Sequence, residues 1–410
     1  MKIVQVHKYY WQRDGASNYF LYLSELLESK GHTVIPFSIE NPKNLKTPFS
    51  KYFVSNVELN DPSKVSFLNK LKGIGRIFYS FEAKKKMEHL IKEEKPDIIH
   101  IHNIYHHISP SILVVAKKYK IPVVMTLHDY KLIVPNYSMF YRGAVHEEDC
   151  KGWYLSCIKN KCQKDSLSQS IVLTLEMIFH HKIMRYYERL VDKFIAPSKF
   201  MKNKCIEYEW KKEKFVNIPN PIDADKFKIA KGDKGYIVFV GRISEEKGVG
   251  YLIDTAFNNP EIPIKIIGEG PQLDILQRAV KQQGLKNVEF TGFQTGKKLE
   301  ELIKGARILI SPSISYENYP LSVLEAKAMG KIVIASKIGG IPEMLPNSML
   351  VESGNAEELA LKIKYWFNKK EEERLEIGQE FRKEVLKTNS PEQHLKQVLS
   401  LYKKLIDHAS

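Results

Sequence analysis

Short apolar runs alternate with segments of helical periodicity along the whole chain. In the first part, Lys2–Val6 predicts a strand, and residues 16–30 predict a helix because their large apolar side chains fall on one stripe. Gly31 follows directly and suits the end of that helix. Further strands are predicted over 33–37, 97–102, 122–127, 194–196 and 215–218, with helices over 110–119 and from 198 onward.

The second part repeats the alternation more cleanly. Strands are predicted over 236–240, 263–267, 288–291, 308–311 and 332–335, and helices over 248–257, 271–283, 297–304 and 320–329. Near-continuous Val and Ile runs between helices are typical of parallel strands buried on both faces. The pattern therefore predicts an α/β protein with two doubly wound units in tandem, residues 1–216 and 217–390.

The two units imply a cleft between them. Residues 217–235, rich in Pro, Asp, Lys and Gly, predict the connection, and residues 391–410 carry apolar residues at helical spacing, so we expect a helix that packs back on the first unit. Ligands of open α/β sheets bind beyond the carboxyl ends of the strands. Two facing sheets would then offer two half-sites, which suits transfer of a group between two bound molecules.

The loop after residues 236–240 carries two cations between two glycines. Arg242 offers a forked set of donors and Lys247 a point charge, so the pair suits a diphosphate. Gly241 and Gly248 would let the backbone turn tightly. The alternative is a surface loop with ordinary charges, and the loop alone does not decide between the two.

The loop after residues 308–311 leads into a helix with Pro320 in its first turn. We expect Glu317 in the loop and Glu325 over a turn into the helix, both facing one ligand at different depths. The free N–H groups of Leu321 and Ser322 would favour a phosphate at the helix N-terminus. Carboxylates accept from hydroxyls, so the two glutamates would suit sugar and ribose hydroxyls beside that phosphate.

Glycine turns follow other predicted strands. Gly268 suits a nucleobase or its ribose, whereas we interpret Glu343, after the turn at 339–340, as structural. In the first unit, Gly15 precedes a helix and would bring backbone N–H groups into the cleft from the opposite side.

Histidines concentrate near two strand ends of the first unit. His128 ends the strand 122–127, where it would contact substrate or move a proton, with a packed or capping histidine as the alternative. For the nearby histidines we expect packing rather than metal binding; they are His100, His102, His106 and His107.

Composition narrows the class of protein. The 410 residues are 43% apolar and 27% charged, which is ordinary for a globular chain, and no apolar run approaches the ~18 residues of a membrane span. The N-terminus lacks signal-peptide anatomy, so we expect a cytoplasmic protein. Residues 1–230 hold 37 basic and 24 acidic side chains, against 26 and 24 in the rest, so the first unit attracts anionic partners.

Four cysteines are present, three of them within residues 150–162. Cys150, Cys157 and Cys162, with His146 before them, have a spacing that would allow zinc but lack the close C-x2-C pairs of a strong zinc motif. We expect free thiols in a loop and leave a metal or a disulfide as the alternative.

These motifs together resemble the retaining glycosyltransferases of family 4, which have the GT-B fold of two facing Rossmann-like domains. The likeness rests on the cation loop Gly241–Gly248, on the E-x7-E spacing from Glu317 to Glu325 and on the turn 339–343. It extends to the segment 218–223, to His128 with the acid that follows it, and to the Gly15 loop, and so covers nearly the whole chain.

The resemblance implies roles for the site residues. Arg242 and Lys247 would bind the donor diphosphate, Glu325 would hold the ribose, and Glu317 would lie beside the donor sugar. His128 would contact that sugar near the reacting carbon. The implied reaction passes a hexosyl or N-acetylhexosaminyl group from a nucleotide-diphosphate sugar to an acceptor hydroxyl with its configuration kept, by front-face attack in which the leaving phosphate takes the proton. No metal or other cofactor is expected, because cations and a helix N-terminus replace it.

Two departures from the family pattern stand out. The family often has two glycines where this chain has Asp14 before Gly15, so we expect Asp14 to point away from the phosphate that Gly15 would line. Residues 318–320, Asn-Tyr-Pro, replace the commoner Gly-Phe-Gly, which leaves the donor sugar open.

We expect the acceptor to bind to the first unit, which carries the excess of basic side chains. Between residues 70 and 86, basic side chains interleave with apolar ones, which suits an anionic membrane face, although an ordinary amphipathic helix is the alternative. The basic ones are Lys70, Lys72, Arg76, Lys84, Lys85 and Lys86, and the apolar ones Leu71, Ile74, Ile77, Phe78 and Phe81. We expect a saccharide or lipid-linked saccharide acceptor of surface polysaccharide assembly, and an enzyme peripheral to the inner membrane face.

Two other functions compete with sugar transfer. A nucleotide-sugar epimerase could use the same scaffold, but the cation loop and the glutamate pair favour transfer. A nucleic-acid-binding protein is suggested by charge alone and lacks a recognition motif, so no nucleic acid is expected as a partner.

Overall fold

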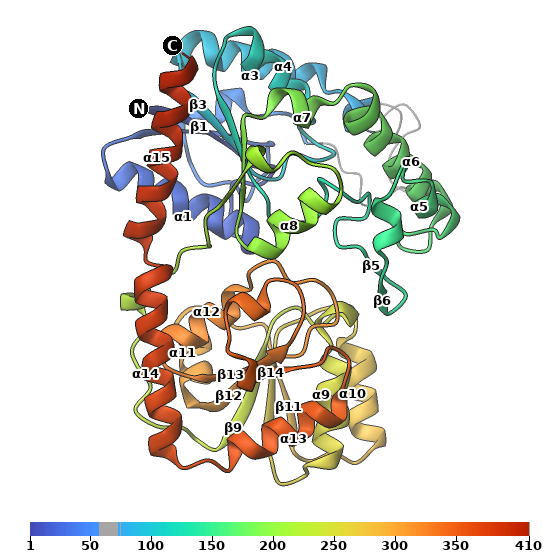
Figure 1. The fold of residues 1–410 in the computed structure, drawn as a ribbon, viewed down its shortest axis with the longest axis vertical. Helices are drawn as coiled ribbons and strands as arrows, with labels where there is room; N and C mark the ends of the chain where they lie inside the picture. The colour runs from blue at the N-terminus through green and yellow to red at the C-terminus, as the bar shows by residue number, and fades with distance from the viewer. Residues whose placement is uncertain (57–72, 74, 410) are drawn as a thin grey trace.

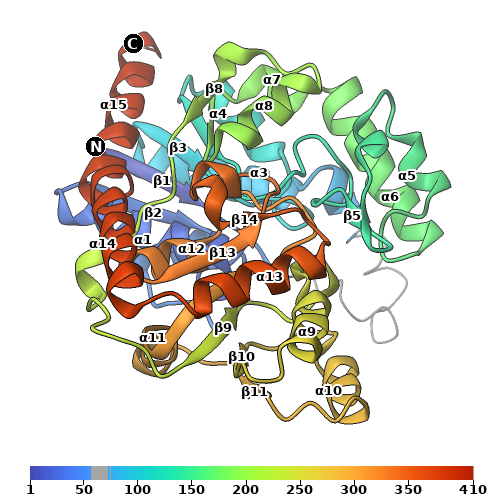
Figure 2. The same cartoon turned by 60° about the horizontal axis from the view of Figure 1, so that its bottom comes forward.

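Two parallel sheets of six strands each form two lobes, one above the other in Figure 1. The structure is a computed structural model that describes residues 1–56, 73 and 75–409. Helices surround both sheets (Figures 1 and 2), and the strands are buried almost without polar alternation. The predicted α/β architecture with two doubly wound sheets is confirmed.

The first sheet has the order β2-β1-β3-β4-β7-β8. Its strands are β1 (Lys2–Val6), β2 (Thr33–Phe37), β3 (Ile98–Ile101), β4 (Val123–Thr126), β7 (Lys193–Ala196) and β8 (Phe215–Asn217). Its main helices are α1 (Gly15–Ser29), α3 (Phe81–Glu94), α4 (Ser111–Lys118), α7 (Tyr186–Leu190) and α8 (Lys199–Glu207). Val4 of β1 is fully buried and pairs with Ile35 on one side and Ile99 on the other, so β1 lies where the strand order reverses.

An inserted segment separates β4 from β7 and lies at one side of the first lobe in Figure 1. It contains the hairpin of β5 (Phe140–Tyr141) and β6 (Ala144–Val145), a 3-10 turn (Glu147–Cys150), α5 (Leu155–Lys159), α6 (Leu167–Met177) and a π-helical turn (Ile178–Ile183). The predicted elements did not include these helices, because α5 has only five residues and the apolar residues of α6 face both solvent and protein.

The second sheet has the order β11-β10-β9-β12-β13-β14. Its strands are β9 (Tyr236–Val240), β10 (Ile264–Ile267), β11 (Val288–Gly292), β12 (Ala306–Ser311), β13 (Ile332–Ser336) and β14 (Leu350–Val351). Its helices are α9 (Val249–Asn258), α10 (Leu273–Gln282), α11 (Gly296–Gly305), α12 (Leu321–Ala328), α13 (Ala356–Phe367) and α14 (Glu371–Thr388). The strand order reverses at β9, between β10 and β12, so the loops after β9 and β12 open at a site where ligands of such sheets bind.

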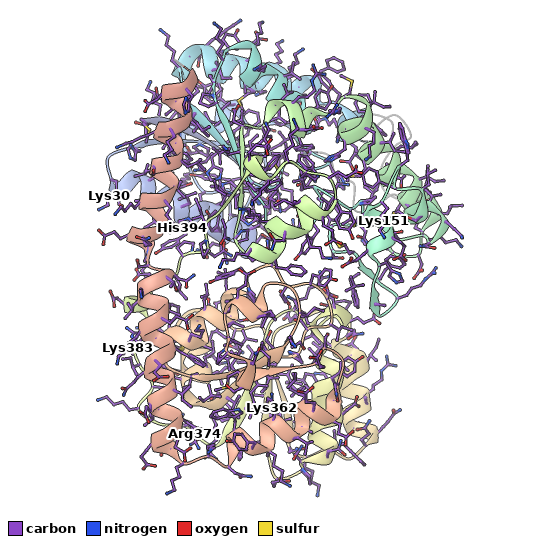
Figure 3. The ribbon with its side chains drawn as sticks, in the orientation of Figure 1. Lys30, Lys151, Lys362, Arg374, Lys383 and His394 are labelled. Atoms are coloured by element: carbon purple, nitrogen blue, oxygen red, sulfur yellow. A yellow bond between two sulfur atoms is a disulfide. The ribbon has the colours of Figure 1, made fainter. Side chains whose placement is uncertain are left out.

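The last helix returns to the first lobe. Helix α15 (Pro391–Ala409) follows α14 after a short break and runs beside the first sheet, as Figures 1 and 2 both show. Leu395, Val398 and Tyr402 belong to an apolar cluster with Ile3 and Tyr19 of that lobe. His394, labelled in Figure 3, anchors the start of α15 through hydrogen bonds to the carbonyl of Pro219 at 2.8 Å and to the Tyr19 hydroxyl at 2.9 Å.

The cysteine expectation is wrong for one pair. Cys157 and Cys162 form a disulfide, while Cys150 and Cys205 are free and buried. After α5 the chain turns back, so that the N–H of Cys162 donates to the carbonyl of Cys157 at 2.9 Å and the two Cα atoms lie 4.8 Å apart. That distance is within the usual range for a disulfide.

Two features of the chain concern a membrane: the length and polarity of its helices, and the segment between residues 70 and 86. Within the described part of the chain, every helix is too short or too polar to cross a bilayer. Of the side chains between residues 70 and 86 that were predicted to meet a membrane face, Lys70, Leu71, Lys72 and Ile74 lie outside the described residues.

Candidate active site

A cleft lies where the carboxyl ends of the two sheets face each other. It has a volume of about 580 Å³, within the range of ordinary small-molecule sites. The first lobe contributes loops after β1, β3 and β4, and the second contributes loops after β9 and β12. Seven of the predicted site residues line it: Gly15, His128, Arg242, Lys247, Glu317, Leu321 and Ser322.

An ion pair lies in the cleft, on the side of the second lobe. The Nζ of Lys247 lies 2.5 Å from Oε1 of Glu317, and the Ser313 hydroxyl donates to the same oxygen at 2.6 Å. Burial alone would raise the pKa of Glu317, but the charge of Lys247 and these hydrogen bonds outweigh it and hold the pKa below its ordinary value. Glu317 is therefore ionised at neutral pH. Lys247 has three donors, so it can hold this carboxylate and a phosphate together.

Two glycines let the surrounding loops meet this closely. A Cβ on Gly248, whose φ is +67°, would lie 1.9 Å from the carbonyl oxygen of Pro312, at the exit of β12. A Cβ on Gly339, whose φ is +62°, would lie 2.2 Å from the carbonyl oxygen of Glu317. Only glycine fits either position. Both glycines of the sequence motifs thus shape the loop that presents Glu317.

The N-terminus of α12 opens into the cleft. Pro320 is its N-cap and has no side-chain capping bond, and Leu321 and Ser322 line the cavity. The first N–H groups of a helix have no partner within it, so they are available to an anionic ligand. This gives the cleft a second source of positive potential beside Lys247.

Two predicted donor-binding residues do not line the cleft. Glu325 and Gly268 are outside the residues that line the cavity. Glu325 is one turn into α12, and burial raises its pKa to about 7. Gly268 has φ +142°, and a Cβ there would lie 1.9 Å from the carbonyl oxygen of Gly241. Gly268 thereby positions the start of the cation loop.

The first lobe presents a glycine and a capped helix. Gly15 begins α1, and a Cβ there would lie 4.0 Å from Leu321 across the cleft. Asp14 is the N-cap of α1: its carboxylate accepts from the N–H of Ser17 at 2.9 Å. Burial would raise the pKa of Asp14, but this bond and the nearby His7 hold it lower. The Asp14 carboxylate is engaged by its own helix, although the residue lines the cavity.

His128 is held from behind by other buried side chains. Its Nε2 lies 3.0 Å from Nδ1 of His102, whose Nε2 hydrogen-bonds to Gln5 at 2.7 Å. Burial, followed by the nearby His7, lowers the pKa of His128 to about 3. His128 is therefore neutral at physiological pH and offers a ligand hydrogen bonds rather than charge. Of the other predicted histidines, His100 and His102 are buried as expected, and His100 bonds to Thr126 at 2.7 Å. His106 and His107 are only partly buried, and His106 lies 3.3 Å from Glu176.

Contacts between the lobes involve residues that the sequence did not single out as functional. The Asn318 amide donates to the carbonyl of Leu127 at 3.2 Å and accepts from the Ser198 hydroxyl at 3.1 Å. Tyr316 donates to Glu147 of the inserted segment. Their only signal in the sequence is that both flank Glu317. Glu343 accepts from the first N–H groups of α8 at 2.8 and 2.6 Å, which confirms its structural interpretation.

The geometry agrees with comparisons to known proteins. The family model "Glycosyltransferase Family 4" matches residues 13–226, and "Glycosyl transferases group 1" matches residues 221–384. A "42.6 kDa protein in cps region" of Klebsiella pneumoniae is 29% identical over 375 residues, covering 86% of this chain and 90% of the relative. The glycosyltransferase MJ1178 of Methanocaldococcus jannaschii is 27% identical, with 84% of each chain covered.

A solved structure has the same fold. The Anabaena protein Alr3699/HepE, in complex with UDP, matches with a TM-score of 0.69 and 16% identity, covering 98% of this chain and 100% of that one. Two facing Rossmann-like sheets with this cleft between them define a glycosyltransferase of the GT-B type. The chain belongs to glycosyltransferase family 4, whose model matches more than half of its length.

Proposed function

We propose that this enzyme transfers a hexosyl or N-acetylhexosaminyl group from a nucleoside-diphosphate sugar to an acceptor hydroxyl with retention of configuration. The observation that carries the proposal is that Lys247, Glu317 and the N-terminus of α12 share one cleft with His128 opposite. A dianionic leaving group would lie at the cations and the helix terminus, and the sugar between Glu317 and His128.

The cleft supplies the leaving diphosphate with positive charge from the chain itself. Lys247, Arg242 and the open N–H groups of α12 all lie at its wall. We therefore expect donor binding to need no metal. The acceptor would attack from the face that the diphosphate leaves, and the departing phosphate oxygen would take its proton. His128, neutral, would hold a sugar hydroxyl near the reacting carbon.

A uridine nucleotide is the first donor to test. The structural neighbour HepE has been described in complex with UDP and with UDP-glucose. Because that likeness is at 16% identity, it guides the choice of probe and leaves the sugar open.

The acceptor proposed is a lipid-linked saccharide of surface polysaccharide assembly, met at a membrane surface. The similarity to a protein "in cps region" supports the pathway. One face of α6 and the turn after it is apolar and open: Leu167 and Leu175 are 49% and 48% exposed, and Ile183 is 60% exposed. Basic side chains are exposed in the same segment, namely Lys151, Lys159, Lys161 and Lys164. Apolar and basic groups together suit a peripheral location on an anionic bilayer.

Calorimetric titration with UDP-, GDP- and ADP-sugars tests the donor site. Lys247→Ala and Glu317→Ala should abolish transfer while circular dichroism stays unchanged, and Lys297→Ala, on the exposed face of α11, should transfer normally. Full turnover in both cleft variants would refute the assignment. NMR of the first-formed product reports whether the anomeric configuration is kept.

Flotation with vesicles tests the membrane face. Wild-type protein should float with vesicles containing anionic lipid and less with neutral ones, and Leu175→Ser with Ile183→Ser should lower the bound fraction. Phe293→Ser, which removes a 67% exposed side chain of the second lobe, is the matched control. Equal flotation of all three proteins would exclude this face.

A further inference from the structure

A buried cluster of metal-binding side chains lies outside the cleft, in the segment inserted between β4 and β7. One ligand atom each from Asp149, Cys157 and Cys162 lies within 4.8 Å of the others. All three side chains are buried, with exposed fractions of 2% or less. Two sulfurs and a carboxylate at this spacing are a donor set that suits a divalent transition metal, zinc above all.

The carboxylate of this cluster has an open oxygen. Within the described residues, Oδ2 of Asp149 has no hydrogen-bond partner, and Oδ1 receives only a long bond of 3.4 Å from Asn160. A buried carboxylate oxygen without a partner is costly, so it calls for a proton or a cation. Once the disulfide is reduced, this oxygen and the two thiolates beside it would together form a donor set for one soft cation.

His146 has the features of a fourth ligand. Its Nδ1 lies 2.9 Å from the Glu148 carboxylate, and its Nε2 is buried and without a partner in the described part of the chain. A metal-binding histidine commonly has its second nitrogen held by a carboxylate in this way. The ring stacks on Tyr141 with 3.9 Å between centroids, and His146 precedes Asp149 by three residues in the same segment.

We propose that in the reduced protein Cys157, Cys162, Asp149 and His146 bind one Zn²⁺. The structure holds the two sulfurs as a disulfide, so the site forms after reduction. Two equivalents of a thiol reductant give two protein thiols and one oxidised reductant disulfide. Zn²⁺ then displaces the two thiol protons, and the thiolates and carboxylate bind as anions. The same pair is thus a disulfide without metal and a metal site when reduced.

The site lies at the base of a contact that reaches across the cleft. Glu147, two residues before Asp149, accepts from Tyr316, from Lys204 at 2.6 Å and from Tyr208 at 3.0 Å. Figure 1 shows the β5–β6 hairpin extending from this segment toward the second lobe, and Figure 3 places Lys151 at the same edge of the first lobe. A metal here would fix the position of Glu147, and through Tyr316 the loop that carries Glu317.

Metal content of the full-length protein tests the site independently of sugar transfer. Protein purified with tris(2-carboxyethyl)phosphine, stripped with a chelator and titrated with Zn²⁺ should retain about one equivalent by atomic emission spectrometry. Co²⁺ as a probe should give thiolate-to-cobalt absorption. Oxidation of the stripped protein to the disulfide should prevent binding. Less than stoichiometric metal with reduced thiols confirmed by Ellman's reagent would overturn the proposal.

Variants distinguish the residues proposed to bind Zn²⁺ from neighbouring residues that do not. Asp149→Asn and His146→Ala keep both cysteines and should each weaken Zn²⁺ affinity by roughly tenfold or more, while Cys157→Ser should lose the cobalt–thiolate band. Cys150→Ala removes a buried thiol one residue from Asp149 that is outside the cluster, and it should bind as wild type does. Equal affinity in Asp149→Asn, or loss of binding in Cys150→Ala, would contradict the ligand set.

Loss of the metal should also change the kinetics of sugar transfer, which can be measured separately. Because the proposed role runs through the cleft contact, metal removal should raise KM for the donor more than it lowers kcat. Failure of transfer altogether would leave the metal stoichiometry unaffected, so the two proposals fail separately.

Discussion

The Nδ1 of His102 and the Nε2 of His128 lie 3.0 Å apart, so the histidine at the end of β4 is supported by one at the end of β3. His102 is fully buried and is itself fixed by Gln5 of β1. Three neighbouring strands thus determine the orientation of one ring in the cleft. The support leaves His128 with a single ring nitrogen for a ligand.

Removal of His128 or of its support should affect transfer to different extents. We expect His128→Ala to lower kcat by roughly 10²–10⁴-fold, and His102→Ala by roughly 10- to 100-fold through misplacement of the ring. Initial rates with saturating donor measure both. Because the pKa of His128 is lowered to about 3, the wild-type pH–rate profile should show no step from this residue between pH 5 and 9. A step that vanishes in His128→Gln would contradict a neutral role.

Buried histidines predict loss of stability in mild acid. Burial and then neighbouring histidines lower the pKa of His100 to about 3, and burial lowers that of His394 to about 4. The unfolded chain binds these protons below pH 6.5, so the stabilising contribution is complete above pH 6.5 and is lost as pH falls toward 3 to 4. At pH 5 each such histidine should cost about 2 kcal/mol of unfolding free energy.

Urea unfolding at pH 7.5 and pH 5.0 measures this loss. His100→Gln, which cannot titrate, should lower stability at both pH values but show a smaller difference between them. If the difference equals that of the wild type, His100 is not one of the groups responsible.

The raised pKa of Glu325 connects pH to donor binding. Burial brings this pKa to about 7, so the carboxylate ionises as pH rises through 7. If Glu325 accepts ribose hydroxyls, donor affinity should increase between pH 6 and 8, and Glu325→Gln should abolish that increase. Calorimetry at the two pH values is the measurement. A pH-independent wild-type affinity would remove Glu325 from the donor site.

The same residue should oppose stability at high pH. An acid with a folded pKa above its unfolded value stabilises the fold at low pH, and this contribution is lost as pH rises from about 4.5 to 7. Glu325→Gln should therefore raise the unfolding free energy at pH 8 by about 1–3 kcal/mol, with little change at pH 5.

A buried ion pair in the first lobe is expected to be fragile. Lys131 lies 2.8 Å from Glu176, and their side chains are 2% and 1% exposed. Burial would raise the pKa of Glu176, but Lys131 and His106 hold it well below its ordinary value. Lys131→Met should lower stability by about 3–5 kcal/mol, because it takes the lysine partner from a buried carboxylate and leaves it only His106 and His180.

The double variant Lys131→Met/Glu176→Leu should recover most of this loss. Thermal unfolding of the single and double variants completes the cycle. A neutral Lys131→Met would show that Glu176 is neutralised by a proton or by His106 instead.

The sequence predicted the strands and the loops of the second lobe well. Tyr236–Val240 was predicted without error, and the loops around Lys247 and Glu317 followed because they come at strand ends of a parallel sheet. The boundary at residues 216 and 217 and the roles given to the cleft residues stay predictions. The sequence did not predict contacts between residues far apart in the chain. The hydrogen bond from Lys247 to Glu317 spans 70 residues and depends on how two glycine turns pack.

The inserted segment was also beyond sequence patterns. Its helices are short and its apolar residues serve both the core and an open face, so no single periodicity marks them. The pairing of Cys157 with Cys162 depends on a reversal of the chain after α5, which spacing alone does not reveal.

Because α15 packs on the first lobe, that lobe cannot be expressed as a stable fragment that ends before α15. Tyr402 and Val398 are fully buried in a cluster with residues of five strands of the first sheet, among them Ile3 of β1, at the other end of the chain. A truncation after α14 would expose Ile3 and Tyr19 to solvent and leave an apolar surface prone to aggregation. Any attempt to study the amino-terminal half by itself must therefore supply the final helix, in cis through a linker or in trans as a peptide.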